Sequence, residues 1–369
     1  MRVIHRRVAV PAVMATAALV LAACGDDKEP VAAGGETQAP AEDWEPAYVD
    51  GVLQPLPDGY PEEKITIVVP DDATSSEGVL SLHVQQIAEK YAPVPVDLEI
   101  RADFESFPTW EALAAINESE EGRNGYIINP FGTVGSLADT MAADVEGATG
   151  VNVDDLRVIA GLEKTRWFMA QCAEVDWDPT VEDLVDYIKE NPGEVRYMGQ
   201  GAGGGVDLGF FSTMKALGVT ADELNAIPIG GVSEQATATA ACEGDVTNTG
   251  IEPQLPHVQA GRLELLMVNG EGRVEEYPDV PTAEEVGVEN PIQSGRQMVT
   301  STEVSPERVA WLAELLRAVS EDEEYIALRE AIPGVEVIYE DTETAEANNE
   351  VILEVTDGVL RDLGLRVES

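Results

Sequence analysis

The sequence predicts an α/β protein whose folded part is divided into two lobes. Short apolar, β-branched runs alternate with segments of helical period, which is the pattern of strands and crossover helices in a parallel sheet. The roughly 300 residues that follow Glu62 suit two lobes better than one. A long apolar run at 156–170 has the character of a strand that leaves one sheet and enters another. We therefore expect two sheets joined by crossing strands.

The first lobe opens with a β-branched run, 64–70, that ends at a proline and is typical of a strand buried on both faces. Loops of small and polar residues are expected after this strand and after the third one, at 71–78 and 130–136. Strands are expected at 64–70, 94–100 and 125–129, and helices at 79–91 and 110–117.

The second lobe repeats this alternation and then returns to the first. Thr180 and Asp183 have the spacing of a helix-capping box, and the apolar run 263–268 is the expected return crossing. Strands are expected at 168–171, 195–198, 225–229 and 246–251, and helices at 180–190, 208–217 and 253–260, with another that ends at 241. A strand at 297–301 and helices at 306–320 and 345–363 complete the chain. Residues 62–165 and 266–369 are thus assigned to lobe 1, and 166–265 to lobe 2.

The first residues, 1–23, have the three parts of an export signal. A basic start is followed by an apolar run, 8–21, that is too short to span a bilayer, and by Leu21-Ala22-Ala23-Cys24. This ending resembles the bacterial lipobox, which implies lipidation of Cys24 and an anchor on the extracytoplasmic face of the cell membrane. An ordinary signal peptide with a chance cysteine is the alternative. Residues 24–61 are rich in Pro, Gly, Ala and acids, and we expect a flexible acidic linker there.

The formal net charge of −48 limits the partners of the chain. So acidic a surface argues against nucleic acid or anionic lipid as a binding partner. We expect no metal site, because His83 and His257 are the only histidines of the exported chain and lack the spacing of metal ligands. Cys172 and Cys242 are the cysteines that remain for a disulfide in an oxidising compartment, and the sequence leaves open whether they are bonded.

A glycine-rich stretch at 199–205 follows a predicted strand and precedes a predicted helix. Glycines let several N–H groups converge on one anion, and the helix dipole favours negative charge at the same place. Gly199, Gly201 and Gly204, with Glu223 further on, also satisfy the dinucleotide fingerprint, and a plain tight turn is a third interpretation. Because an exported protein has no supply of NAD or ATP, we favour an anion-binding loop and expect no cofactor.

Four stretches carry recognisable motifs. They are Tyr60-Pro61 with the strand 65–70, Asn191-Pro192-Gly193 with Tyr197-Met198-Gly199, the segment 255–263 (LPHVQAGRL) and the segment 277–287 (YPDVPTAEEVG). Together they resemble the solute-binding proteins of tripartite tricarboxylate transporters, the TctC or Bug family. The resemblance implies a periplasmic-binding-protein-like fold of type II, with two crossing strands between the lobes. It also implies that a small organic carboxylate is enclosed between the lobes and carried to a membrane permease.

Two loops depart from the family pattern. The Pro-Gly-Gly-x-x-Asp expected after the first strand is replaced by 73–78 (ATSSEG), and the glycine loop expected after the second strand by 101–110, which has no glycine. The hydroxyls of Thr74, Ser75 and Ser76 can still donate hydrogen bonds to a ligand. The identity of the ligand, whether a dicarboxylate, a tricarboxylate or an aromatic acid, therefore does not follow from the resemblance.

The candidate contacts come from the loops at the strand ends and from one crossing strand. Phe131 is the expected apolar wall of the site. Lys164 and Arg166 alternate along the crossing strand and would face the same way, toward a second carboxylate, unless they pair with surface acids. The expected ligand-binding residues are Thr74, Ser75, Ser76, Phe131, Gly132, Thr133, Arg166, Gly201, Ala202, Gly203, Gly204, Gly205, Gly231, Val232 and Ser233.

We predict a monomeric, non-catalytic receptor that closes on its ligand by hinge motion and serves the subunits of a tripartite tricarboxylate permease. An exported hydrolase is a rival, but the sequence has no Gly-x-Ser-x-Gly elbow. A receptor that signals to a membrane kinase is a second rival. That role needs the same binding site, so the sequence does not separate it from transport.

Overall fold

The computed structural model describes residues 44–104, 107–200, 204–229, 231–270, 272–288 and 294–366. The predicted signal peptide, Cys24 and most of the predicted linker lie outside this part of the chain, as do Gly201, Ala202 and Gly203. The described residues all belong to one compact unit, Ala39–Ser369. Within them, no helix is both long enough and apolar enough to cross a membrane.

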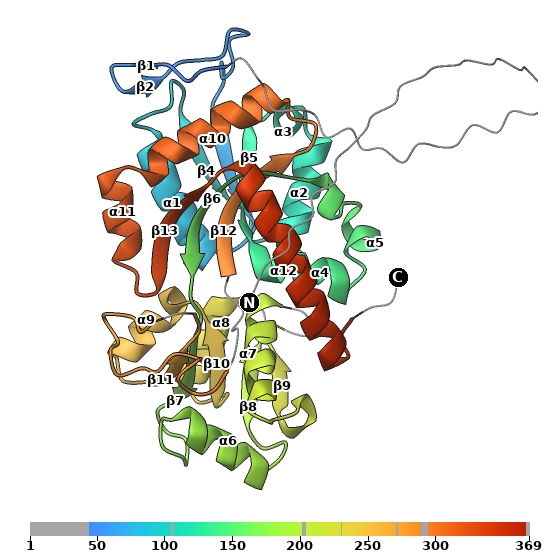
Figure 1. The fold of residues 1–369 in the computed structure, drawn as a ribbon, viewed down its shortest axis with the longest axis vertical. Coiled ribbons are helices and arrows are strands. Elements are labelled where there is room, and N and C mark those ends of the chain that lie inside the picture. Colours follow the sequence, from blue (N-terminus) through green and yellow to red (C-terminus); the bar gives the residue numbers. More distant parts are fainter. Residues whose placement is uncertain are drawn as a thin grey trace, which may run out of the picture. The chain divides into compact units, whose positions relative to one another are not determined.

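A six-stranded mixed sheet forms the first lobe, in the order β13-β6-β12-β5-β3-β4 (Figure 1). Its strands are β3 (Ile65–Val69), β4 (Val96–Ile100), β5 (Ile127–Gly132), β6 (Leu156–Thr165), β12 (Ser294–Ser301) and β13 (Val335–Glu340). β3 pairs in parallel with β4 and β5, whereas β12 lies antiparallel between β5 and β6. Parallel neighbours need long crossovers, which the helices supply.

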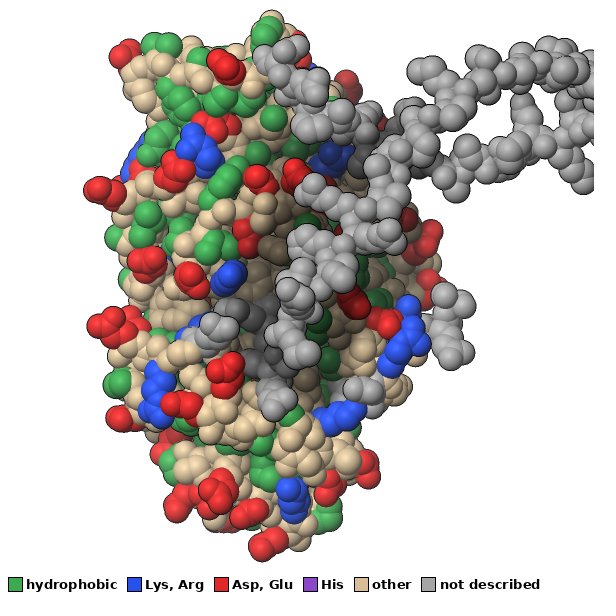
Figure 2. All heavy atoms as spheres, in the orientation of Figure 1, with side chains coloured by type: hydrophobic (Ala, Val, Ile, Leu, Met, Phe, Trp, Pro, Cys, Tyr) green, Lys and Arg blue, Asp and Glu red, His purple; other side chains and the backbone are tan. Residues whose placement is uncertain are grey.

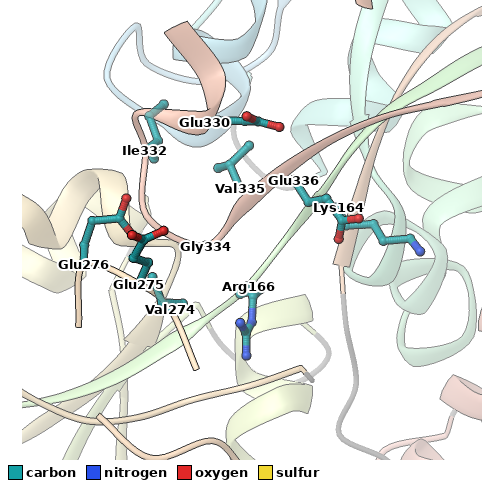
Figure 3. Close-up of a pocket in the computed structure, with 10 residues that line it drawn as sticks. All are labelled: Lys164, Arg166, Val274, Glu275, Glu276, Glu330, Ile332, Gly334, Val335 and Glu336. Atoms are coloured by element: carbon teal, nitrogen blue, oxygen red, sulfur yellow. The ribbon is translucent and has the colours of Figure 1, made fainter. Parts of the chain in front are cut away.

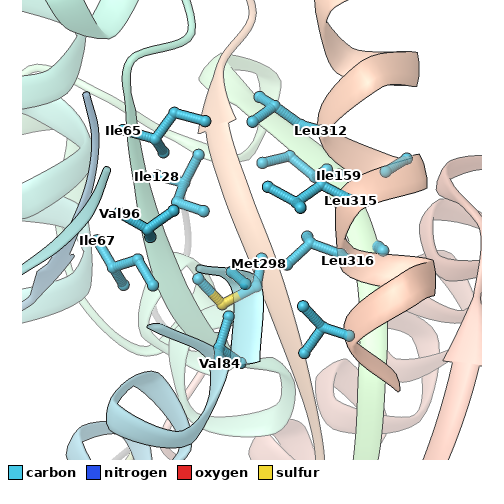
Figure 4. Packing of buried hydrophobic residues seen from close by; sticks show 14 of the residues in the cluster. Ile65, Ile67, Val84, Val96, Ile128, Ile159, Met298, Leu312, Leu315 and Leu316 are labelled. Atoms are coloured by element: carbon cyan, nitrogen blue, oxygen red, sulfur yellow. The ribbon is translucent and has the colours of Figure 1, made fainter. Parts of the chain in front are cut away.

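Helices cover both faces of this sheet. On one face α1 (Ser76–Ala88), α10 (Pro306–Ser320) and α11 (Glu323–Glu330) surround an apolar cluster that includes Ile67 and Leu312 (Figure 4). The helices that follow the other strands are α2 (Pro108–Glu118), α3 (Glu120–Arg123), α4 (Thr133–Ala142), α5 (Val145–Thr149) and α12 (Thr342–Leu363). A second cluster around Trp110 and Phe131 lies on their side. Burial on both faces explains why β3 is an unbroken apolar run.

The second lobe is built on a five-stranded sheet in the order β11-β7-β10-β8-β9. Its elements are β7 (Phe168–Cys172), α6 (Val181–Glu190), β8 (Arg196–Gly199), α7 (Gly205–Ala216), β9 (Asn225–Pro228), α8 (Val232–Ala240), β10 (Val246–Thr249), α9 (Ile251–Gln259) and β11 (Leu263–Val268). In its core the ring of Tyr197 stacks on Phe210 with 3.7 Å between centroids. Cys172 and Cys242, whose pairing the sequence left open, form a disulfide between β7 and the end of α8.

The two connections between the sheets differ from the prediction. The run 156–170 is two strands: β6 ends in the first sheet at Thr165, and β7 begins in the second sheet at Phe168. The expected return crossing at 263–268 was wrong, because β11 is an edge strand of the second sheet. The chain crosses back between Val268 and Ser294 instead. β11 is apolar because it packs against the core of its own lobe.

Two loops predicted in the first lobe are shorter than expected. α1 starts at Ser76, because the side chain of Ser75 caps the helix by accepting a hydrogen bond from the N–H of Gly78. β5 continues through Pro130 to Gly132, and α4 follows at once, so the loop expected at 130–136 does not exist. Proline is tolerated there because β3 pairs with β5 only at Ile127 and Ile128 and needs no N–H further along.

Nearly half of the predicted linker, residues 44–61, is folded. Residues 48–53 form a hairpin of β1 (Tyr48–Val49) and β2 (Val52–Leu53), and the side chains of Leu53 and Tyr60 are fully buried. The linker prediction was therefore wrong for 44–61, whose few apolar residues are too widely spaced to give a periodic signal. β13 and α11 were not predicted from the sequence.

Candidate functional site

Four helices of the two lobes begin at a glycine. α4 starts after Gly132, α7 after Gly204, α8 after Gly231 and α9 after Gly250. Each helix follows the carboxyl end of a strand, and at none of them does a side chain cap the first turn. The first N–H groups of a helix have no intrahelical partner and lie at the positive end of its dipole. These helices therefore present backbone donors of the kind that bind an anion.

The loops at these strand ends lie against each other across the two lobes. We call them the facing loops: 71–77 and 132–135 from the first lobe, and 204–205, 231–233 and 250–252 from the second. The facing loops lie at the carboxyl ends of strands, which is where α/β proteins generally bind their ligands.

Glycine is required where the facing loops touch. A Cβ atom on Gly205 would lie 2.6 Å from the backbone nitrogen of Gly135 in the opposite lobe, closer than real contacts allow. A Cβ on Gly250 would lie 2.9 Å from the hydroxyl of Ser76. The small residues thus let the backbones of α4 and α7 approach, and they let α9 approach α1.

Two side-chain hydrogen bonds also join the facing loops. The hydroxyls of Thr74 and Ser233 lie 3.3 Å apart, and the hydroxyl of Ser76 donates to Oε2 of Glu252 over 3.2 Å. Val232 packs against an apolar cluster that contains Val134 and Val206, one from each lobe. The lobes are in direct contact at both polar and apolar residues.

Several residues predicted to bind ligand have structural partners of their own. The Ser75 hydroxyl donates to the Asp72 carbonyl over 2.9 Å and caps α1, so it is committed to the turn. The Thr133 hydroxyl accepts a hydrogen bond of 3.0 Å from the N–H of Gly295, whereas the Thr133 N–H, the group expected to meet a carboxylate, begins α4. The Phe131 ring is fully buried, edge-on to Trp110 with 5.8 Å between centroids, and is part of a core instead of an exposed wall. The expectation of an apolar wall at Phe131 therefore needs correction: the side chain points into the lobe.

Arg166 is also held away from the facing loops. Its Nε donates to the carbonyl of Asn269 over 2.6 Å and its Nη2 to the carbonyl of Gly272 over 2.5 Å, so it ties the first connection between the sheets to the second. Lys164 and Arg166 line the same hollow, as expected from their alternation along the strand. This hollow, of about 510 Å³, is not formed by the facing loops (Figure 3). The hollow is bordered by β6, β13 and the segment 274–276, and four glutamates line it: Glu275, Glu276, Glu330 and Glu336. None of the facing loops contributes to it.

A buried carboxylate shapes the start of the glycine-rich loop. Asp207, in the first turn of α7, accepts hydrogen bonds of 2.8 Å from the Tyr197 hydroxyl and 3.0 Å from the Gln200 N–H. A Cβ on Gly199 would lie 2.5 Å from Oδ1 of Asp207. The chain thus supplies its own anion, the Asp207 carboxylate, to the N–H of Gln200 at the start of this loop.

The charged residues of the first-lobe facing loop were not predicted from the sequence. Asp71 and Asp72 follow β3 directly, and Glu77 lies in the first turn of α1. Burial, followed by the charge of Glu77, raises the pKa of Asp71 to about 6. The position of the two aspartates at a strand end was a usable signal in the sequence. Acidic side chains are spread over the whole face drawn in Figure 2, so composition alone did not mark these.

Beneath these loops lies a buried network of charges. Arg329 of α11 donates from Nε and Nη2 to the two carboxylate oxygens of Glu163, over 2.9 and 3.0 Å, and neither side chain is exposed. Nη2 of Arg329 also lies 3.8 Å from Oε1 of Glu252. Arg296 of β12 pairs with Glu77 over 3.1 Å. No local pattern could have found these pairs, because their members are far apart in the sequence.

The family comparison agrees with this geometry. The model of the tripartite tricarboxylate transporter family receptor, TctC, matches residues 133–351, more than half of the chain. The chain belongs to this family. The match begins at α4, so it does not include the facing loop 71–77, where the sequence departs from the TctC pattern.

Solved structures show the same TctC fold. The structure of periplasmic binding protein BugD aligns with a TM-score of 0.73 at 17% identity, over 84% of this chain and all (100%) of that one. A protein described as R. palustris Rpa4515 with adipate aligns with a TM-score of 0.72 at 17% identity, over 83% of this chain and 98% of the other. MatC from Rhodopseudomonas palustris with bound malate gives 0.69 at 14% identity, over 82% and 100%. These likenesses establish the two-lobed fold.

Curated relatives match over a shorter part. A UPF0065 protein of Bordetella pertussis is 31% identical over 108 residues, which is 29% of this chain and 32% of that protein. A UPF0065 protein from Cupriavidus necator is 32% identical over 110 residues, 30% of this chain and 32% of that protein. The chain therefore aligns with about a third of the length of these relatives.

Proposed function

We propose that the protein is an exported, non-catalytic receptor that captures a small organic carboxylate between its facing loops. It delivers this solute to the membrane permease of a tripartite tricarboxylate transporter. The observation that carries the proposal is the set of four helices that begin at glycine, with no side-chain cap, where the two lobes touch. Such N–H groups bind carboxylates well.

The comparisons support this proposal. The chain belongs to a family of transporter receptors, and two proteins of the same fold are described with the dicarboxylates adipate and malate. Thr74, Ser76, Gly132, Thr133, Gly204, Gly205, Gly231, Val232 and Ser233 lie in the facing loops and remain candidate contacts, as do Gly201, Ala202 and Gly203 outside the described residues. The protein acts as a monomer.

A thermal-shift series tests ligand capture. Citrate, succinate, malate, adipate, benzoate and a neutral sugar are each added to the purified protein. A ligand whose free concentration is 100 times its Kd stabilises the folded state by about 2.7 kcal/mol. At least one carboxylate should therefore raise the melting temperature by several degrees. The ligand should be recovered unchanged, which a hydrolase would not allow. If no carboxylate raises the melting temperature, the proposal is rejected.

A separate experiment tests the anchor at Cys24. We expect the wild-type protein in the membrane fraction and the Cys24→Ser variant in the soluble extracytoplasmic fraction, because the lipid is attached to this thiol. Equal distribution of the two proteins would exclude a lipid anchor at Cys24 and leave the ligand proposal unaffected.

A further inference from the structure

Glu252 places a carboxylate of the second lobe among groups of the first. It lies in the first turn of α9, and its Oε2 accepts a hydrogen bond of 3.2 Å from the hydroxyl of Ser76 at the start of α1. Its Oε1 lies 3.8 Å from Nη2 of Arg329 on α11. A Cβ atom on Gly250 would lie 2.8 Å from Oε2, so glycine at this position leaves room for the carboxylate. Glu252 is therefore a direct contact between the lobes.

This carboxylate is buried, and only one of its oxygens has a hydrogen-bond donor. The side chain of Glu252 is 8% exposed, and Oε1 receives no hydrogen bond from the residues that the structure describes. Nη2 of Arg329 is too distant to donate one. A buried carboxylate oxygen without a donor is unfavourable, and the cost falls on the charged form. Burial accordingly raises the pKa of Glu252 above its ordinary value of 4.5, although Arg329 opposes the shift.

The arginines that act on Glu252 are already paired within the first lobe. Arg329 makes a two-point pair with the fully buried Glu163 of β6. Arg296 of β12 lies 3.1 Å from Glu77 of α1. Of the three carboxylates that meet here, Glu252 is therefore the one without a guanidinium of its own. The contact between the lobes carries an excess of negative charge whenever Glu252 is ionised.

Neither histidine of the described chain supplies the missing positive charge. His83 of α1, 3.3 Å from Arg329, is neutral, because burial and the neighbouring guanidinium lower its pKa to about 4. On α9 itself, Nδ1 of His257 lies 2.7 Å from Nη2 of Arg262, and burial and this arginine lower the pKa of His257. Among the described residues, no group of three acidic, histidine or cysteine side chains is arranged to hold a metal ion. A proton on Glu252 would remove the excess charge.

We infer that Glu252 is a proton-dependent clasp: its carboxylate takes up one proton when the lobes close and releases it when they open. In the open form the carboxylate would leave Ser76 and Arg329 and be hydrated, so its pKa would return to the ordinary value. The closed form holds the proton more tightly, so closure gains most below that value and loses the gain as the pH rises through the raised pKa of Glu252. Acidification therefore strengthens closure. This inference goes beyond solute capture, because it concerns the lobes themselves, whichever solute they enclose.

Asp71 is a second acid at the contact between the lobes and has to be separated from Glu252. Oδ1 of Asp71 and Oδ2 of Asp72 lie 3.8 and 3.9 Å from the position of a Cβ on Gly231 in the second lobe. Burial, followed by the charge of Glu77, raises the pKa of Asp71 to about 6, so Asp71 also titrates above the ordinary range of carboxylates. The proteins compared in the test therefore all carry Asp71→Asn.

Small-angle X-ray scattering of the ligand-free protein measures the separation of the lobes. The parent protein carries Asp71→Asn and Cys24→Ser, and its radius of gyration is followed from about pH 8 to about pH 5. We expect the radius to fall as the pH is lowered, because the closed form is the more compact one. Glu252→Gln in the same protein resembles the neutral acid in shape and charge. It should stay compact across this range and lose most of the change.

A matched control and a second variant complete the test. Glu243→Gln, at an exposed position of the same lobe, should keep the full change of the parent protein. Glu252→Ala replaces Glu252→Gln if the circular dichroism spectrum shows that the latter does not fold. The inference is overturned if the radius of the parent protein is constant or rises as the pH falls, or if the change survives the substitution of Glu252. No solute is present, so neither result bears on carboxylate capture.

Discussion

The facing loops of the two lobes are built in different ways. The first lobe presents side chains there, with Asp71 and Asp72 above two arginine pairs, Arg296 with Glu77 and Arg329 with Glu163. The second lobe presents mainly backbone, because three of its helices begin at glycine, and a disulfide joins its strand β7 to the end of α8. The difference teaches that two facing loops of similar topology can differ in which groups they mainly present, acidic side chains in the first lobe and glycine backbone in the second.

The largest loss of stability is expected when the buried ion pair between Arg329 and Glu163 in the first lobe is broken. Arg329→Met leaves Glu163 buried without its partner, which should lower the free energy of unfolding by about 3–5 kcal/mol. Urea unfolding measures the loss. Arg317→Met is the matched control, because Arg317 is half-exposed in its pairs with Glu314 and Glu321 and its removal should cost about 1 kcal/mol or less. Equal losses in the two variants would show that the buried pair does not support the lobe.

The corresponding test of the second lobe removes its disulfide. The bond joins residues 70 positions apart, and Cys172→Ser should lower the stability by about 2–4 kcal/mol, because the unfolded chain regains the freedom of that loop. Cys242→Ser should have the same effect, and the double variant no larger one. Additive losses, measured by thermal unfolding, would mean that the two cysteines act separately.

A change in the glycine backbone should remove ligand binding without unfolding the lobes. Valine at position 205 would meet the backbone of Gly135, so the lobes of Gly205→Val cannot approach as closely. We expect the ligand-induced stabilisation of about 2.7 kcal/mol at 100 times Kd to disappear while the circular dichroism spectrum is kept. Gly358→Val is the control, since a Cβ there meets no atom within 4 Å. A normal thermal shift in Gly205→Val would show that this contact is not needed for capture.

The smallest effect is expected from Asp71, an acidic residue of the first-lobe facing loop, and concerns the pH dependence of stability. The pKa of Asp71 is raised to about 6 in the folded protein, so its contribution to stability is present below about pH 4 and is lost as the pH rises through 6. Asp71→Asn should therefore gain about 1–2 kcal/mol relative to wild type between pH 4 and pH 7, after allowance for partial exposure. Denaturant unfolding at a series of pH values measures the difference. A constant difference would show that Asp71 titrates normally.

Much of the fold could be predicted because it is encoded locally. Helix 306–320 and the strands near 65–69 and 196–199 carry periodic apolar patterns, and the structure has them at or close to the predicted bounds. β13 and α11 were missed because their residues are mostly polar or only partly buried. The hairpin at 48–53 was missed because its stability comes from burying Leu53 against the first lobe, which no local pattern records.

Only part of the candidate site could be predicted, because some of its features are encoded locally and others depend on tertiary packing. Glycines at strand ends mark the facing loops in the sequence, and the structure brings Gly205, Gly231 and Gly250 against the opposite lobe. Arg166 had the right alternation, but which side of the sheet that alternation faces depends on where β13 and the segment 274–276 pack. Ser75 and Phe131 lay in the predicted loops and proved to be a helix cap and a core residue.

The sequence by itself determined the α/β class, the family suggested by its motifs, and the places where glycine frees the backbone. Those features depend on neighbouring residues. Only the tertiary structure decided which charges are balanced, because Glu163 and Arg329 are 166 positions apart and Ser76 and Glu252 are 176 apart. Whether a buried carboxylate has a partner depends on distances across the fold, and those distances are set by packing, not by order along the chain.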